Sequence, residues 1–248
     1  MENKKHNTIF HNIATVLLLL IFQQSASAAG RFVANRFTYD KIDEYGIFAW
    51  ISVHHIIQLL LAIIAIVIIA KVLKLNFEFG FGDRKIGMTH VANLTVVVLV
   101  YAFIWHLVAH LLGNVRMPDH PLNFTNIAGQ LGFQLLLSGP SEEILFRALA
   151  IVLLAYSFRE SKAIKIGKLG ISYENIIAAS LFTLAHVSWS INPFSLSASW
   201  VQLILSMVLG IWYGIAYQQS KSIIYPILMH SIWNVVAVGA RYIHLAFL

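Results

Sequence analysis

Cysteine is absent from the 248-residue chain, and charged residues make up only 11% of it. The missing thiols exclude disulfides, thiolate nucleophiles and thiolate metal sites. A typical soluble domain carries about 25% charged residues, so the scarcity of charge excludes an ordinary soluble protein. Charge is missing altogether from five long stretches, which are residues 6–30, 45–70, 86–115, 175–220 and 222–240. Because a helix needs about 20 apolar residues to cross a bilayer, the sequence predicts an all-α polytopic membrane protein.

The apolar segments divide into seven candidate transmembrane helices. These spans are roughly Thr8–Ala28, Ile47–Ala70, Val91–Leu112, Ile127–Ser157, Asn175–Trp189, Ala198–Gln218 and Ser222–Ala246. The fourth span contains Gly139 and Pro140, where we expect the helix to kink or restart because proline lacks a backbone N–H. The prediction is therefore a bundle of about seven transmembrane helices.

The first span admits two interpretations. Lys4 and Lys5, the apolar run Ile13–Phe22 and the small residues Ala26-Ser27-Ala28 also fit a cleavable signal peptide. We favour a retained first helix, because a polytopic protein does not need a cleaved signal. Cleavage would leave six transmembrane helices and would not change the other spans.

The basic residues predict the orientation of the chain in the membrane. Cytoplasmic loops of membrane proteins are enriched in Lys and Arg. With a cytoplasmic N-terminus, the inner segments hold Lys4, Lys5, Lys71, Lys74, Arg84, Lys85, Arg159, Lys162, Lys165, Lys168 and Lys221, and the outer ones hold Arg31, Arg36, Lys41, Arg116 and Arg241. This excess predicts a cytoplasmic N-terminus and an outer C-terminus. The net charge of +6 then reflects topology and lipid headgroups, not binding to nucleic acid.

Three charged residues lie inside the fourth apolar span, namely Glu142, Glu143 and Arg147. A charge at the centre of a membrane helix costs about 2.5–3.5 kcal/mol on insertion scales, so we expect a functional reason for them. Glu143 and Arg147 are four residues apart and can pair along one helix face. Glu142 lies about 100° round the helix without an obvious partner on it, which suits a general base. The alternative is a buried ion pair that only stabilises the bundle.

Two other spans carry polar residues at helical spacing. Phe182 and His186 are four residues apart in the fifth span, and His230 and Asn234 are four apart in the seventh. Counted from the inner ends of their helices, these groups and Glu142 lie about 12–22 Å deep. They therefore fall in one layer and can converge on a buried pocket. A single histidine on an apolar helix is more often a packing residue, but three such spans favour a site.

These three motifs, EExxxR, FxxxH and HxxxN, resemble those of the CAAX prenyl protease type II-like and bacteriocin-processing family, also called CPBP or Abi. The resemblance divides the chain into N-terminal transmembrane helices and loops at 1–124, a catalytic core at 125–240, and the end of the last helix at 241–248. It implies an intramembrane endopeptidase that acts on a membrane-associated peptide or protein, in the plasma membrane of a bacterium.

The resemblance also implies roles for the residues of the three motifs. Glu142 would activate water with help from His186, while His230 and Asn234 would form the oxyanion hole. The remaining two charged residues, Glu143 and Arg147, would orient the site. The implied mechanism needs no cofactor, although relatives were long regarded as metalloproteases and zinc stays an alternative.

Further histidines admit both structural and functional interpretations. His106 and His110 in the third span are expected to make interhelical hydrogen bonds, with metal ligation or pocket lining as alternatives. His54 and His55 are expected at the membrane interface.

Two other functions remain open for the chain as a whole. One is a non-catalytic bacteriocin immunity or scaffold protein, and the other is a proton-coupled transporter, which is less favoured because no internal repeat is visible.

Overall fold

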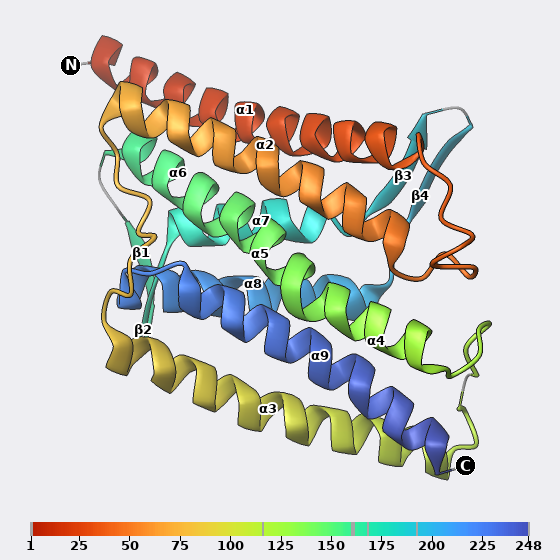
Figure 1. Ribbon diagram of the computed structural model, residues 1–248. Helices are drawn as coiled ribbons and strands as arrows, with labels where there is room; N and C mark the ends of the chain where they lie inside the picture. Colours follow the sequence, from red (N-terminus) through yellow and green to blue (C-terminus); the bar gives the residue numbers. More distant parts are fainter. Residues whose placement is uncertain (1, 116, 160–161, 168, 192, 248) are drawn as a thin grey trace.

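The chain folds into a bundle of helices that run back and forth between two ends of the molecule, at the left and right of Figure 1. The computed structural model describes residues 2–115, 117–159, 162–167, 169–191 and 193–247. Its elements are α1 (Glu2–Ala34), α2 (Ala49–Leu73), α3 (Arg84–Leu111), α4 (Phe124–Phe133), η1 (Gln134–Ser138), α5 (Gly139–Glu143), η2 (Ile144–Leu149), α6 (Ala150–Phe158), β1 (Ala163–Ile166), β2 (Leu169–Ser172), α7 (Tyr173–Leu184), β3 (Ser188–Ile191), β4 (Phe194–Ser197), α8 (Trp200–Ser220) and α9 (Ile224–Ala246). The two elements η1 and η2 are π-helical turns. Arg116 and Lys168, which enter the charge count above, lie outside the described residues.

This architecture confirms the prediction of an all-α polytopic membrane protein. Within the described residues, four helices are long and apolar enough to cross a membrane by themselves: α1 from Ile9 onwards, α2, α3 and α8. The segmented rod α4–α6, the short α7 and α9 occupy the places of the other three predicted spans. The only strands among the described residues form two small antiparallel hairpins, β1–β2 and β3–β4.

Side-chain caps mark where several helices begin. Asp83, Asn123, Ser172 and Ser199 precede α3, α4, α7 and α8, and each side chain accepts a hydrogen bond from a backbone N–H in the first turn. The first N–H groups of a helix have no partner within the helix, so such a cap satisfies one of them. The sequence therefore sets the start of α7 immediately after the β1–β2 hairpin.

The fifth predicted span, Asn175–Trp189, is wrong at its C-terminal end. The helix α7 stops at Leu184, and Trp189 lies in the β3–β4 hairpin, paired with Leu196. Polar and apolar residues alternate in Ser188–Ile191, which is the period of a strand rather than of a helix. With 12 residues, α7 is about 18 Å long and does not cross the apolar layer by itself.

The fourth predicted span does not restart at Pro140. Helical backbone continues from Phe124 to Phe158, and the segment that holds Pro140 is flanked by the π-helical turns η1 and η2. Wider turns of this kind absorb local disruption of the α-helical hydrogen-bond pattern and often lie at functional sites. The charged residues of this span lie in α5 and η2, so the irregular backbone surrounds them.

Small residues bring the helices of the site close together. A Cβ at Gly139 would lie 2.6 Å from Ser231 Oγ, so α5 and α9 are closely packed there. On α8, a Cβ at Gly214 would overlap Asn175 of α7, and one at Gly210 would lie 3.2 Å from Ala179. Contacts this short require glycine, as is common between membrane helices. Gly210 and Gly214 of α8 therefore form a packing surface for α7.

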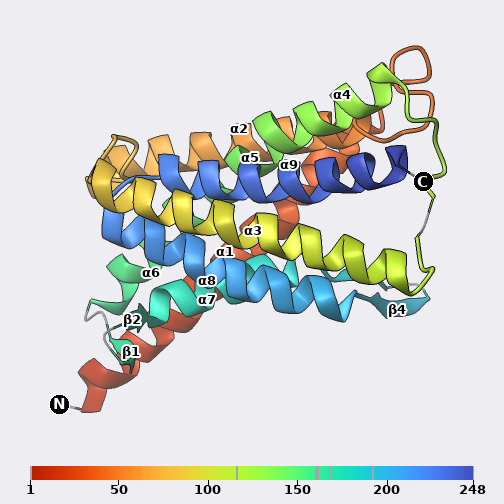
Figure 2. The ribbon, with the colours of Figure 1, turned by 90° about the horizontal axis from the view of Figure 1, so that it is seen from below.

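The two ends of the bundle carry different connections. The N-terminus, the α2–α3 connection, the β1–β2 hairpin and the α8–α9 turn lie at one end (Figures 1 and 2). The C-terminus, the α1–α2 connection and the β3–β4 hairpin lie at the other. This arrangement separates the basic segments at the N-terminal end from the less basic segments at the opposite end. That the N-terminal end faces the cytoplasm stays a prediction.

Candidate active site

Glu143 and Arg147 form the ion pair that their spacing predicts. Arg147 Nε lies 3.0 Å from Glu143 Oε2, and both side chains are completely buried. The guanidinium of Arg147 also lies over the ring of Phe182, with its Cζ 4.6 Å from the ring centroid, and 5.6 Å from that of Tyr213. A desolvated cation gains stabilisation from such aromatic faces. The pair is therefore held between α7 and α8.

His230 connects the two glutamates to α9. Its Nδ1 lies 2.8 Å from Glu143 Oε1, and its Nε2 lies 3.6 Å from Glu142 Oε2. The ring is stacked on Tyr213 with 5.4 Å between centroids. Glu142 thus has no partner on its own helix, as expected, but it faces a histidine from another one. The convergence of the fourth and seventh predicted spans on one buried site is confirmed.

The two neighbouring glutamates differ in their access to space. The side chain of Glu143 is wholly buried, whereas that of Glu142 is 19% exposed. Glu142 lines a cavity of about 580 Å³ between α1, α2 and the segment that follows α7. Its other polar lining residues are Gln23, Gln24, Ser27, Arg31, His54, His55, Gln58 and Ser188. Of the two carboxylates, Glu142 is the one that a water molecule or a substrate can reach from this cavity.

His186 and Asn234 lie on the other side of the site. Together with His230 they line a second cavity of about 390 Å³ between α3, α7, α8 and α9. His186 lies just beyond the end of α7, and its Nδ1 is 2.9 Å from the carbonyl oxygen of Phe182. Since a carbonyl only accepts, Nδ1 carries the proton and the Nε2 of a neutral ring is left as an acceptor. Asn234 Nδ2 donates to Ser138 Oγ at 3.0 Å, which leaves one of its two amide hydrogens available.

Phe182 has a positioning role in this arrangement. Its ring lies 4.8 Å from the His186 ring and 5.3 Å from the ring of Phe146, which lines the first cavity. The backbone oxygen of the same residue fixes the tautomer of His186. The FxxxH spacing therefore places a packing residue and a polar residue together at the boundary between the two cavities.

His54 and His55, which are expected at the membrane interface, make contacts inside the bundle. Both side chains are buried, and His55 Nδ1 makes a 2.6 Å hydrogen bond with Ser141 Oγ, next to Glu142. His55, like His186 and His230, lies close enough to Glu142 to interact with it electrostatically. His54 stacks on Trp50 and lines the same cavity as Glu142. The sequence does contain a signal, because His54, His55 and Gln58 share a face of an otherwise apolar span.

His106 and His110 do not reach this site. The Nδ1 atoms of His106 and His244 lie 3.1 Å apart, and the His110 ring lies 5.7 Å from the His244 ring. The expected interhelical hydrogen bond is thus present, between α3 and α9. In the part of the chain that the structure describes, no group of three or more His, Asp or Glu side chains is arranged to hold a metal ion.

Comparison with known protein families gives a match over the second half of the chain. Residues 124–236 match the model of a family described as type II CAAX prenyl endopeptidase Rce1-like, which confirms the resemblance seen in the three motifs. The match begins at α4 and ends within α9, so it includes Glu142, Glu143, Arg147, His186, His230 and Asn234. No curated protein and no solved structure matches the chain. The family is one of proteases, which supports a hydrolase, and α1 and α2 lie outside the matched residues.

Proposed function

We propose that this integral membrane protein is an endopeptidase that hydrolyses a peptide bond of a membrane-associated peptide or protein within the bilayer. The observation that carries the proposal is the unequal environment of two adjacent carboxylates. Glu143 is enclosed by Arg147 and His230, whereas Glu142 lines a cavity. The match to a protease family supports the same activity.

Glu142 is assigned the role of general base. It takes a proton from water as the oxygen attacks the carbonyl carbon of the scissile peptide, and it later returns that proton to the leaving amine. Such proton transfer requires an acceptor that the water can reach, which Glu142 provides and Glu143 does not. His186 offers an acceptor on Nε2 and helps to orient the water. The water supplies both the hydroxyl of the new acid and the hydrogen of the new amine, so the step is balanced without a cofactor.

His230 and Asn234 are assigned to the oxyanion. A tetrahedral intermediate carries its negative charge on the former carbonyl oxygen, and donors aimed at that oxygen lower the barrier. Asn234 has an unused amide hydrogen. His230 already uses Nδ1 on Glu143, so Nε2 donates only when the ring carries both protons. Ionised Glu143 stabilises that imidazolium, which gives the Glu143–Arg147 pair a positioning role.

The two cavities indicate how a substrate is placed. The cavity that Glu142 lines adjoins α1, α2 and the start of β3, while the other combines aromatic and apolar residues with polar ones, among them His186, Gln202 and Asn234. A peptide that lies across the site therefore meets polar as well as aromatic and apolar groups on both sides. This fits a substrate associated with the membrane of the bacterial cell in which we place the protein.

The test is hydrolysis by the purified full-length protein in liposomes. Membrane peptides are incubated in water enriched in ¹⁸O, and the products are read by mass spectrometry. Incorporation of ¹⁸O into a new C-terminal carboxylate, present with the wild type and lost with Glu142→Gln, supports the proposal. Correctly folded protein that cleaves nothing would favour a non-catalytic immunity or scaffold role, and proton flux through the liposomes would favour a transporter.

A further inference from the structure

The cavity in front of Glu142 has a polar wall on α1 and α2, which the proposed chemistry does not use. Its residues are spaced about one helical turn apart, so on each helix they share a face. They are Gln23, Gln24, Ser27 and Arg31 of α1 with His54 and Gln58 of α2. We call this set the α1–α2 polar wall. It lies outside the residues that match the family, so its role has to come from its own chemistry.

The contact between α1 and α2 is not polar throughout. Toward the N-terminus of the chain, Leu19 of α1 and both Ala62 and Ile66 of α2 belong to one apolar core. At Gly30 the two helices approach closely, because a Cβ there would lie 2.7 Å from the carbonyl oxygen of His54. Apolar and small residues thus hold the two helices together, and the amides of the polar wall need another explanation.

The amides of the polar wall lie deep in the apolar layer. Counted from the helix ends that the α1–α2 connection joins, Gln24 and Gln58 are about 14–15 Å along their helices, which is close to half of the ~30 Å hydrocarbon core. Neither amide hydrogen-bonds with another described residue, and Gln23 Oε1 is buried without a partner among them. An unpaired amide is unfavourable in such surroundings. Since Gln24 and Gln58 line the cavity, a ligand there can supply the missing partners.

The chemistry of the polar wall matches a peptide backbone. A glutamine amide offers two donors and one acceptor, all of them neutral, and backbone N–H and C=O groups complement both kinds. Arg31, the one cation of the wall, has its Nη1 2.8 Å from Ser27 Oγ, to which it donates. A helical segment satisfies its own backbone groups and needs no such wall. An unwound segment in the apolar layer exposes these groups and must find partners for them, so the wall complements an unwound peptide.

We propose that the α1–α2 polar wall binds the substrate segment beside the scissile bond in an unwound, extended conformation, through hydrogen bonds from Gln24 and Gln58 to its backbone. The inference rests on the proposed function, because it takes the substrate as the ligand. Apolar residues of the same cavity, such as Trp50 and Phe146, are available to the side chains of that segment. Unwinding also frees the scissile carbonyl from the helical hydrogen bonds that would keep it from the water at Glu142.

The test is the binding of two synthetic peptides to the full-length protein in nanodiscs, measured with Glu142→Gln so that nothing is cleaved. Both are fluorescent membrane-spanning peptides of leucine and alanine, and one has a central Gly-Pro pair, which interrupts its helix. The interrupted peptide should bind about tenfold more tightly, as expected when one more backbone hydrogen bond is made. This result supports the inference even if the wild type cleaves neither peptide, so the inference and the proposed peptidase activity can fail separately.

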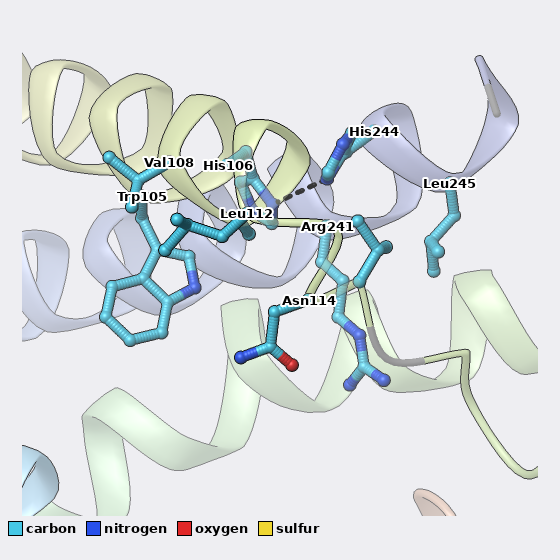
Figure 3. A pocket seen from close by; sticks show the side chains of 10 residues that line it. Trp105, His106, Val108, Leu112, Asn114, Arg241, His244 and Leu245 are labelled. Carbon is cyan, nitrogen blue, oxygen red and sulfur yellow. Dashed lines mark hydrogen bonds between the residues drawn. The ribbon is translucent and has the colours of Figure 1, made fainter.

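Two further variants assign the binding to the polar wall. Gln58→Met and, separately, Gln24→Met keep the length of the side chain and remove its amide. Each should weaken binding of the interrupted peptide by about tenfold and leave that of the uninterrupted peptide unchanged. Asn114→Leu is the matched control, because it also removes an amide that lines a cavity of about 580 Å³. That cavity lies elsewhere, between α3 and α9, which we call the α3–α9 seam (Figure 3).

Three results would overturn the inference. Equal binding of the two peptides would show that an unwound backbone is not recognised. Unchanged binding by both glutamine variants, or an equal loss with Asn114→Leu, would remove the polar wall from the binding site. With a peptide that the wild type cleaves, Gln58→Met should raise KM and leave kcat nearly unchanged, whereas a lower kcat at the same KM would make the cavity a path for water. Thermal unfolding of each variant separates these outcomes from misfolding.

Discussion

Glu142 and Glu143 are adjacent in the sequence, yet only Glu143 is enclosed by partners on both of its oxygens. Arg147 Nε lies 3.0 Å from one oxygen and His230 Nδ1 lies 2.8 Å from the other. Glu142 has His230 Nε2 at 3.6 Å and is otherwise turned toward a cavity. The difference arises because neighbouring helix positions point about 100° apart. This difference in environment predicts that the same substitution at Glu142 and at Glu143 affects activity and stability differently.

Glu142→Gln should reduce turnover by at least about 100-fold, the usual effect of losing acid–base catalysis. Its melting temperature should stay close to that of the wild type, because the amide has the same shape and loses only a long contact with His230. Initial rates of peptide cleavage and thermal unfolding in the same detergent are the measurements. Near wild-type cleavage by this variant would exclude Glu142 as the base.

Glu143→Gln should act through stability as well as activity. It leaves Arg147 without its countercharge in a buried layer, and breaking such a pair costs about 3–5 kcal/mol. The double variant Glu143→Leu with Arg147→Met removes both charges and should recover much of the lost stability without recovering cleavage. Denaturant unfolding monitored alongside activity tests this. Full activity in the stable double variant would show that the pair does not orient His230.

Gly139→Ala should separate the glutamates from His230. The added Cβ would lie 2.6 Å from Ser231 Oγ and 3.0 Å from the carbonyl oxygen of Ile227, so the Ser231 side chain must turn and the α9 backbone must shift by a few tenths of an ångström. Overpacking of this kind costs about 1–3 kcal/mol, and we expect cleavage to fall as well. Gly132→Ala on the same rod is the control, because its Cβ would meet nothing within 4 Å. Equal behaviour of the two variants would contradict the close packing at Gly139.

The orientation can be tested with single cysteines, since the chain has none of its own. Ala163 in β1 and Ser195 in β4 are exposed and lie in hairpins at opposite ends of the bundle. The excess of basic residues predicts that Ala163→Cys faces the cytoplasm. An impermeant thiol reagent should therefore label Ser195→Cys on intact cells and Ala163→Cys only after permeabilisation. The reverse pattern would place the N-terminus outside.

A chelator should leave cleavage by the wild type unchanged, because the proposed mechanism uses a carboxylate and not a metal ion to activate water. His106→Ala combined with His110→Ala should keep measurable activity, since these residues lie at the α3–α9 seam and not at Glu142. Activity assays before and after dialysis against chelator, with metal analysis of the protein, provide the measurement. Loss of activity on chelation with recovery on added zinc would favour a zinc enzyme.

The sequence predicts the ion pair and the layer of polar groups because helical spacing and depth are local properties. The pairing of Glu143 with Arg147 is predicted from their separation by four residues. The depth of His230 in the same layer is predicted by counting residues along two helices. The end of α7 is mispredicted because apolar content alone does not distinguish a helix from the alternating Ser188–Ile191. The contact of His55 with the site is not predicted, because it depends on Ser141 of another helix and spacing within α2 does not contain such a contact between distant segments.

The wall of the cavity in front of Glu142 is built largely by α1 and α2, which precede the residues matched by the family. The groups assigned to the chemistry and many of those that would contact a substrate are thus encoded in different parts of the chain. Under the proposed function, substitutions in α1 and α2 can alter which peptides are accepted while the glutamates and their partners stay fixed. Substrate preference can then change between homologous enzymes while all of them keep the same hydrolytic reaction.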